Sequence, residues 1–510
     1  MVMRTYSMGL YGMEAFPVAV EVDLARALPS FDMVGLPDAA VKESRDRVRS
    51  AIKNCGFSFP EGRVTVNLAP ADKRKEGPIY DLPLFVTLLC ASGQMGADPG
   101  DSVFLGELSL AGEVRPIKGA LPMAIGAREA GFTRIFVPEA NASEAAAVTG
   151  LTVYPVRNVM QMLDGLQGKA DLQPAVPAET VEAEMDSSLD FSDVRGQEQA
   201  KRGLEIAAAG GHNVLLIGPP GSGKSMLAKR LPSILPDMTL AERMEATKIH
   251  SIAGALPHGT SLLTRRPFRA PHHTISPAGL SGGGALPHPG ELSLAHNGVL
   301  FLDELPEFPH ATMEVLRQPI EDGVVTISRV SGSVTYPCSV MLVAAMNPCP
   351  CGYFGHPTRR CTCKPAAVER YLNRVSGPLL DRLDLHIEVP PVEFESLSGP
   401  KQGDSSEEIR RRVNAAREIQ NARFSETGVP CNAHIPADML DDACQLTRAG
   451  RILLKEAFEK LGLSARAYNR VLKVARTIAD LDNSEEITPA HVAEAVQYRS
   501  LDRKYWAREL

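Results

Sequence analysis

A glycine-rich loop between an apolar run and a helical segment constrains the fold of this chain more than any other feature. Residues 213–217 have the short apolar character of a buried parallel strand, and Gly218-Pro-Pro-Gly-Ser-Gly-Lys-Ser225 follows them directly. The glycines let backbone N–H groups turn inward around phosphates, and the N-terminus of the helix that follows favours anions. The loop therefore predicts an α/β P-loop domain with a parallel sheet, which binds a nucleotide through Gly218, Pro219, Pro220, Gly221, Ser222, Gly223, Lys224 and Ser225.

The ends of two further apolar runs supply the other groups that phosphoryl transfer requires. We expect Lys224 to contact the β- and γ-phosphates of ATP, and Ser225 to bind Mg²⁺. One apolar run ends at Asp303, which is expected to hold Mg²⁺, and at Glu304, which is expected to orient and polarise the attacking water. The alternative is a surface carboxylate pair at the end of a core strand. Another apolar run ends at Asn347, whose amide is predicted to sense the γ-phosphate.

Size and charge limit the class of protein. A chain of 510 residues, 44% hydrophobic and 23% charged, exceeds one ordinary core and predicts two to four globular domains. No apolar stretch is long enough for a signal peptide or a membrane span, so we expect a soluble, cytoplasmic protein with no membrane partner. The formal charge of -7 gives no global attraction to nucleic acid, so polyanion binding requires local basic patches.

Two polar stretches divide the chain into three blocks. Residues 172–190 are rich in Pro, Ala and acidic side chains, and residues 396–408 are rich in Gly, Ser and charge. The predicted organisation is an α/β domain at 1–168, an acidic linker at 169–190, a P-loop core at 191–395 and a helical lid at 396–510. Helical periodicity at 452–461 and 471–478 supports the lid.

Four of the nine cysteines form a cluster within the P-loop core, at 349–363. Cys349, Cys351, Cys361 and Cys363 suit a closed tetrahedral Zn²⁺ site, which is structural because no coordination position stays open. His356 is an alternative ligand. Reduced structural thiols and a redox pair are the alternatives to zinc.

Several longer motifs carry a resemblance to a known family over nearly the whole chain. They are Pro267-Phe-Arg-Ala-Pro-His-His-Thr274, Pro289-Gly-Glu-Leu-Ser-Leu-Ala-His296, Leu316-Arg-Gln-Pro319 and Asn347-Pro-Cys-Pro-Cys-Gly352. In these motifs the chain resembles the ComM/YifB group of magnesium-chelatase-like AAA+ ATPases. The resemblance implies a homo-hexameric ring with ATP between subunits and, for ComM itself, ATP-driven branch migration of DNA during recombination.

The resemblance also implies roles for two arginines. The segment that ends at Asp384 resembles the family's finger motif, so Arg382 is expected to reach the ATP of a neighbouring subunit, with Arg374 as the competitor. The alternative is an ion pair between Arg382 and a nearby aspartate. Arg466 matches the second sensor, which acts on the γ-phosphate of its own subunit, and Arg470 lies one turn further.

Two inserted segments are candidates for contact with single-stranded or branched DNA. The insertion at 253–289 contains Arg265 and Arg266, and residues 323–336 read as a β-hairpin with Arg329 near its tip. In related ring motors such a hairpin points into the pore, where arginines track the phosphate backbone without reading sequence. The alternative is that these arginines are solvated or ion-paired.

The first block resembles the Lon-protease-like domain. Ile79 stands where the resemblance places the nucleophilic serine, and Leu121 stands at the lysine of the dyad. Lys118 lies nearby, but a lysine without a serine does not restore acyl transfer. We therefore expect a non-proteolytic scaffold, in an ATP-driven motor that remodels DNA. A magnesium-chelatase-type motor for metal insertion or protein remodelling is the alternative.

Overall fold

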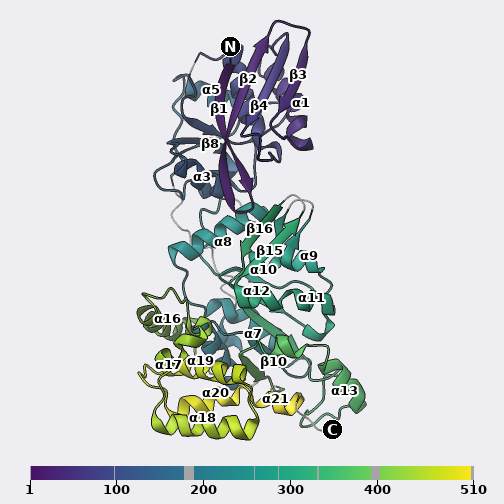
Figure 1. Ribbon diagram of the computed structural model, residues 1–510, viewed down its shortest axis with the longest axis vertical. Helices are drawn as coiled ribbons and strands as arrows, with labels where there is room; N and C mark the ends of the chain where they lie inside the picture. Colours follow the sequence, from purple (N-terminus) through teal and green to yellow (C-terminus); the bar gives the residue numbers. More distant parts are fainter. Residues whose placement is uncertain are drawn as a thin grey trace. The chain divides into compact units, whose positions relative to one another are not determined.

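The computed structural model describes residues 2–96, 98–176, 189–257, 259–284, 287–329, 332–391 and 403–506. They form two compact units, each made of segments distant in sequence (Figure 1). The first unit contains Met1–Ala183, Leu240–Thr264 and Ser328–Tyr336, and the second contains Glu184–Thr239, Arg265–Ile327 and Pro337–Leu510. Most of the predicted acidic linker lies outside the described residues, which omit 177–188.

A seven-stranded mixed sheet forms the centre of the first unit. Its order is β3 (Ser30–Val34), β4 (Arg63–Ala69), β2 (Glu14–Ala25), β1 (Val2–Tyr11), β5 (Ser102–Phe104), β8 (Arg134–Pro138) and β9 (Thr152–Val156). β1 and β2 pair antiparallel, whereas β1, β5, β8 and β9 run parallel. Alternate residues of β2, namely Val18, Val20 and Val22, are fully buried, as expected when one face of a sheet is covered. A short pair, β6 (Glu107–Leu108) and β7 (Val114–Arg115), lies outside this sheet.

Helices of this unit pack on the sheet or on one another. They are α1 (Ala39–Asn54), α2 (Asp81–Ala91), α3 (Ala120–Glu129), α4 (Ala142–Ala145), α5 (Val159–Leu166) and α8 (Leu240–Ala253). Asp38 caps α1 by accepting a hydrogen bond from the backbone N–H of Val41. Residues 81–89 of α2 are all buried, so this helix lies within the core of the unit.

The positions expected to correspond to a protease dyad belong to the apolar core. Leu121 is fully buried and Ile79 is 9% exposed, and both belong to the hydrophobic cluster of the unit. Neither side chain offers a nucleophile or a base. The fold of this unit therefore uses both positions for packing.

Helix α8 comes from the middle of the chain but docks on α3, beside Leu121. The Ser251 hydroxyl donates to the Glu144 carboxylate at 2.5 Å, and the Leu121 N–H donates to the same oxygen at 3.3 Å. The Gly119 N–H donates to the Ser251 carbonyl at 3.0 Å. Burial raises the pKa of Glu144, although these hydrogen bonds oppose the shift. A buried carboxylate with several donors thus anchors α8 in the first unit.

The second unit is built on a parallel sheet of five strands, which confirms the predicted α/β class. The order is β11 (Phe268–Arg269), β14 (Val299–Leu302), β17 (Met341–Met346), β10 (Val214–Ile217) and β18 (Leu385–Glu388). Every residue of β10, β14 and β17 is buried, as in sheets covered on both faces. The other helices of this core are α6 (Glu198–Gly210), α7 (Lys224–Arg230), α9 (Pro277–Ser281), α10 (Glu291–Leu294), α11 (His310–Val315), α12 (Arg317–Asp322), α13 (Pro365–Leu372) and α14 (Gly377–Leu380).

The predicted hairpin forms, and one of its faces is packed. β15 (Val324–Arg329) and β16 (Gly332–Pro337) make a two-stranded sheet, as do β12 (Gly282–Gly283) and β13 (His288–Pro289). The buried face of the hairpin carries Val325, Ile327, Val334 and Tyr336. Val334 lies against the turn between β1 and β2, because a Cβ added to Gly12 would approach Val334 Cγ1 to 2.5 Å.

The C-terminal segment is helical, as the periodicity predicted. It contains α16 (Ser406–Arg423), α17 (Leu440–Ala443), α18 (Arg448–Leu461), α19 (Ala465–Leu481), α20 (Pro489–Gln497) and α21 (Ser500–Tyr505). Ser405 and Glu408 form a capping box at the start of α16, and Ser464 caps α19. Among the described residues, no helix combines the length and apolar character needed to cross a membrane.

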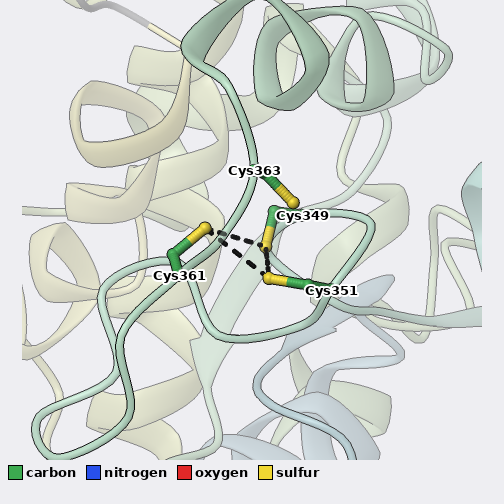
Figure 2. Close-up of side chains that lie close together, drawn as sticks. All are labelled: Cys349, Cys351, Cys361 and Cys363. Carbon is green, nitrogen blue, oxygen red and sulfur yellow. Dashed lines mark hydrogen bonds between the residues drawn. The ribbon is translucent and has the colours of Figure 1, made fainter.

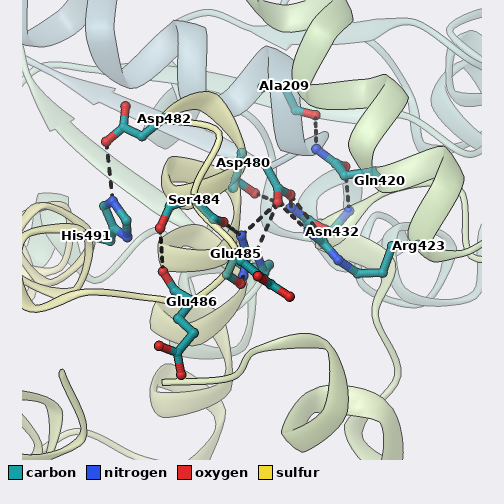
Figure 3. Close-up of polar contacts among 12 residues, drawn as sticks. Ala209, Gln420, Arg423, Asn432, Asp480, Asp482, Ser484, Glu485, Glu486 and His491 are labelled. Atoms are coloured by element: carbon teal, nitrogen blue, oxygen red, sulfur yellow. Dashed lines mark hydrogen bonds and ion pairs between the residues drawn. The ribbon is translucent and has the colours of Figure 1, made fainter. Parts of the chain in front are cut away.

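A buried carboxylate ties the C-terminal helices together (Figure 3). Asp480 of α19 accepts hydrogen bonds from Arg423 of α16 at 2.5 and 3.0 Å, and from Arg476 at 3.1 Å. Asn432 donates to the same carboxylate at 2.7 Å. Because a buried charge needs several donors to offset its lost hydration, this cluster specifies how α16 and α19 meet.

Candidate nucleotide-binding site

The phosphate loop has the local geometry that the sequence predicts. Residues 218–223 connect the end of β10 to the N-terminus of α7, and Gly221 and Gly223 have φ values of 76° and 95°. Side chains are disfavoured at both of these left-handed positions. At Gly218, a Cβ would lie 2.1 Å from the carbonyl oxygen of Val389, so only glycine fits. The loop therefore takes a conformation that exposes backbone N–H groups ahead of a helix.

The side chain of Lys224, the first residue of α7, folds back into this loop. Its ammonium donates to the carbonyls of Gly218 at 2.8 Å and Pro219 at 2.9 Å, and to the Asn347 amide oxygen at 3.1 Å. Burial lowers the pKa of Lys224 to about 8, against the opposing charges of Asp303 and Glu304. The structure thus brings together the loop lysine and the asparagine at the end of β17, which are 123 positions apart in sequence.

A hydroxyl and a carboxylate from different strand ends also meet. The Ser225 hydroxyl donates to an Asp303 oxygen at 2.6 Å, and the other Asp303 oxygen accepts the Glu304 N–H at 3.0 Å. Mg²⁺ prefers oxygen ligands and binds through one or two protein groups, water and substrate phosphates. The two side chains fit such an ion, because both present oxygen atoms beside the phosphate loop.

Glu304 lies at the exposed edge of this site. Its backbone is left-handed, with φ of 54°, and its side chain is 59% exposed. A left-handed glutamate costs of order 1 kcal/mol and is held by the surrounding structure, a feature that clusters at functional sites. The Glu304 carboxylate lies 3.6 Å from Nδ1 of His273, a residue to which the sequence assigned no role. The only sequence signal for His273 was its place in the motif 267–274.

Both candidate finger arginines form ion pairs within their own chain. Arg382 pairs with Glu321 and donates to the Pro378 carbonyl at 2.8 Å. Arg374 is 51% exposed and contacts Glu307 at 3.1 Å. Glu321 was not among the partners expected from sequence, because it lies 61 positions away and is brought close only by tertiary packing.

The two candidate sensor arginines differ in environment. Arg466 is exposed in the first turn of α19. Arg470, by contrast, is largely buried and lies 3.5 Å from Asp384. Burial alone raises the pKa of Asp384, but contacts with His212 and Arg470 outweigh it and hold the pKa below the usual value. Arg470 therefore belongs to a buried charge cluster at the start of β10.

The candidate DNA-binding arginines also differ. Arg266 donates to the backbone carbonyls of Pro236 at 2.7 Å and Asn297 at 2.8 Å, so its guanidinium supports the local backbone. Arg265 and Arg329 are exposed. Arg329 ends β15, and residues 330–331 lie outside the described part of the chain.

The four clustered cysteines converge (Figure 2). Cys349, Cys351 and Cys361 have sulfur separations of 3.4, 3.6 and 3.7 Å, and with Cys363 all four sulfurs lie within 4.8 Å of one another. Tetrahedral Zn²⁺ with Zn–S bonds of about 2.3 Å sets its sulfurs about 3.8 Å apart. His356 is not in this group; its Nδ1 accepts the Arg359 N–H at 3.0 Å. The donor set that fits a metal is therefore the four thiolates.

Three family models match the chain in succession. Subunit ChlI of Mg-chelatase matches residues 20–141, magnesium chelatase, subunit ChlI, matches residues 190–397, and magnesium chelatase, subunit ChlI C-terminal, matches residues 403–499. The matches cover part of the first unit's sheet, the P-loop core and the C-terminal helices from α16 to α20.

Several bacterial proteins are similar over almost their whole length. The chain is 47% identical to uncharacterized protein YifB of Escherichia coli (strain K12) over 96% of each chain. It is 43% identical to competence protein ComM of Haemophilus influenzae, over 98% of this chain and 97% of the relative. It is 41% identical to uncharacterized protein Rv2897c of Mycobacterium tuberculosis, over 97% of this chain and 98% of the relative. With a phosphate loop, a parallel sheet and these relatives matched end to end, the chain belongs to the ComM/YifB family of magnesium-chelatase-like AAA+ ATPases.

Proposed function

We propose that this AAA+ ATPase is a homo-hexameric motor that uses ATP hydrolysis to move along and remodel single-stranded or branched DNA. The observation that carries the ATPase part is the meeting of Lys224 with Asn347 and of Ser225 with Asp303 at one edge of the sheet. The DNA part rests on the resemblance to ComM, since the similar protein of Haemophilus influenzae is a competence protein. The exposed arginines Arg265 and Arg329 are the proposed contacts with the phosphate backbone.

The proposed mechanism assigns one task to each group at the site. Lys224 exchanges its carbonyl partners for the β- and γ-phosphates, while Ser225 and Asp303 hold Mg²⁺, which neutralises phosphate charge when bound. Glu304 accepts the proton of the attacking water, and Asn347 orients this water toward the γ-phosphate.

Arg466 contacts the γ-phosphate in the same subunit, and Arg382 of a neighbouring subunit stabilises the transferring phosphoryl group, with Arg374 as the competing candidate.

The four-cysteine cluster is proposed to hold one structural Zn²⁺ per chain. Cys349, Cys351, Cys361 and Cys363 supply all four ligands, which leaves no open position for catalysis. Denaturation in the presence of a chromogenic chelator should release about one zinc per chain. A folded protein that carries no metal contradicts this assignment.

The first test is ATP-dependent migration of a synthetic four-way DNA junction with the ATPase rate measured in parallel. The Glu304→Gln substitution should lower hydrolysis by about 100-fold or more and stop migration while ATP binding persists, because only the proton acceptor is lost. Arg329→Ala should leave hydrolysis without DNA unchanged and uncouple it from migration. Arg451→Ala, at an exposed position of α18, is the matched control.

The salt dependence of binding gives a second readout. Loss of one phosphate contact to single-stranded DNA should reduce the slope of log affinity against log salt by about 0.7, so Arg265→Ala and Arg329→Ala should each show this change.

The matches to chelatase subunits favour the alternative of a magnesium-chelatase-type motor for metal insertion or protein remodelling. That alternative replaces the DNA motor if DNA neither binds nor stimulates hydrolysis.

A further inference from the structure

The four-cysteine cluster begins two residues after Asn347, at the catalytic edge of the sheet. Cys349 is fully buried, and the backbone turns back at once, because the Gly352 N–H donates to the Cys349 carbonyl at 2.9 Å. No flexible spacer separates the predicted water-positioning amide from the first sulfur. Any change in the position of Cys349 is therefore transmitted to Asn347.

The same turn packs against the phosphate loop. Gly352 has a φ of 82°, and a Cβ at this position would lie 2.4 Å from Cδ of Pro220. On the preceding strand, the Gly218 N–H donates to the Met346 carbonyl at 3.3 Å. The cysteine loop thus forms one wall of the phosphate loop, and only glycine allows so close an approach.

The ligands come from two arms of the loop. Cys349 and Cys351 lie on the arm next to the nucleotide site, while Cys361 and Cys363 lie on the arm that leads into α13 (Figure 2). A metal bound to all four sulfurs joins the arms and fixes the first one. Four converging thiols without a metal supply no comparable bond, since S–H is a weak donor.

We infer that Zn²⁺ in this cluster controls ATP hydrolysis, because it holds Asn347 and Pro220 in the positions that catalysis requires. The inference rests on the proposed ATPase function and deepens it. The cysteines act as positioning residues, since none of them is assigned to ATP. The motor is therefore expected to hydrolyse ATP at its full rate only when it carries zinc.

The experiment compares Cys361→Ser, Asn347→Ala and the double variant in the full-length chain. Cys361 lies on the far arm, so the substitution removes a ligand without changing the segment next to Asn347. Cys55→Ser, in the first unit, is the matched control. Zinc content, kcat, KM for ATP, affinity for a fluorescent ATP analogue and melting temperature are measured for each protein.

Cys361→Ser should lose zinc and lower kcat about tenfold or more, as substitutions that misplace catalytic groups do, whereas Cys55→Ser should retain both. If the cluster acts through Asn347, the double variant should fall no more than about twofold below Asn347→Ala alone. Two independent losses that multiply, or full kcat without zinc, overturn the inference. Zinc restored to wild-type protein stripped by a zinc-selective chelator should restore kcat.

The same measurements distinguish failure of the proposed ATPase function from failure of the inference about zinc. If zinc-loaded wild-type protein binds the ATP analogue but does not hydrolyse ATP, the ATPase proposal fails. The part of the inference that zinc holds Pro220 in position is then decided by affinity for the analogue in the presence of Mg²⁺, because removal of zinc should loosen the wall at Pro220 and weaken binding. An affinity that is unchanged after zinc is stripped overturns it.

Discussion

At the scale of single residues, the nucleotide site is organised around a lysine with a depressed pKa. Three oxygen atoms accept hydrogen bonds from Lys224, but none of the three carries a formal charge, so burial dominates and lowers the pKa to about 8. Bound phosphates bring negative charge to the same ammonium and raise its pKa. ATP binding should therefore be linked to protonation of Lys224.

This linkage predicts a specific pH dependence. Below pH 8 the lysine is already charged and affinity is constant, whereas above pH 8 binding must first protonate it, so affinity should fall by up to about tenfold at pH 9. Calorimetry in two buffers of different ionisation enthalpy should detect uptake of about half a proton per site at pH 8. Lys224→Arg stays charged, so the same pH slope in that variant contradicts the assignment.

The residue types at the strand ends of this site could be predicted from the sequence, whereas the side-chain contacts that surround them could not. Lys224, Ser225 and Asp303 were predictable because phosphate binding dictates residue types next to strand ends, and the parallel sheet brings those ends together. The pairing of Arg382 with Glu321 was not predictable, since it depends on how α12 and α14 pack. The contact between His273 and Glu304 also arises only from tertiary structure.

At the scale of elements, the buried Asp480 joins helices that the sequence predicted separately. Periodicity at 452–461 and 471–478 was enough to locate α18 and α19, because it is a pattern within one helix. The way α16 and α19 meet depends on Arg423 and Arg476, which approach one carboxylate from different helices. Sequence periodicity contains no information on such a pairing.

Asp480→Ala should destabilise the C-terminal helices by about 3–5 kcal/mol, because it leaves the buried Arg476 and the partly buried Arg423 without their counter-charge. Denaturant unfolding followed by circular dichroism measures the loss. Asp482→Ala is the control: this half-exposed carboxylate contacts His491 at 3.3 Å, and its removal should cost about 1 kcal/mol or less. Equal losses in the two variants contradict the proposed role of Asp480.

At the scale of the whole molecule, the proposed ring places Arg382 in the ATP site of a neighbouring subunit. Arg382→Ala and Glu304→Gln should each abolish hydrolysis when assayed alone. Mixed rings should regain activity, since some interfaces pair an intact Glu304 with an intact Arg382 from the next subunit. Light scattering with a non-hydrolysable ATP analogue tests the hexamer itself.

A mixture of Arg374→Ala with Glu304→Gln tests whether Arg374, in place of Arg382, reaches the neighbouring ATP site. If only that mixture regains activity, the trans-acting role belongs to Arg374, whose guanidinium is half-exposed. If neither mixture is active, both arginines act within their own subunit and the interface model is wrong.

The domain boundaries at 168, 190 and 395 are predictions from the sequence. The two compact units, by contrast, follow spatial packing, and each contains segments that are not continuous in sequence. Polar composition indicates which segments can be exposed linkers. It contains no information on whether a helix later in the chain packs into a unit formed by earlier residues. For α8, the decisive contacts are those of Ser251 with Glu144 and Gly119, which lie more than a hundred positions upstream.

That anchor has a consequence for biosynthesis. A ribosome synthesises the sheet of the first unit long before it translates Ser251, so Glu144 lacks its Ser251 donor while β10 and α7 of the second unit are being made. The hairpin segment Ser328–Tyr336 arrives later still. The first unit is thus completed only after β10, α7 and β14 of the P-loop core have been translated.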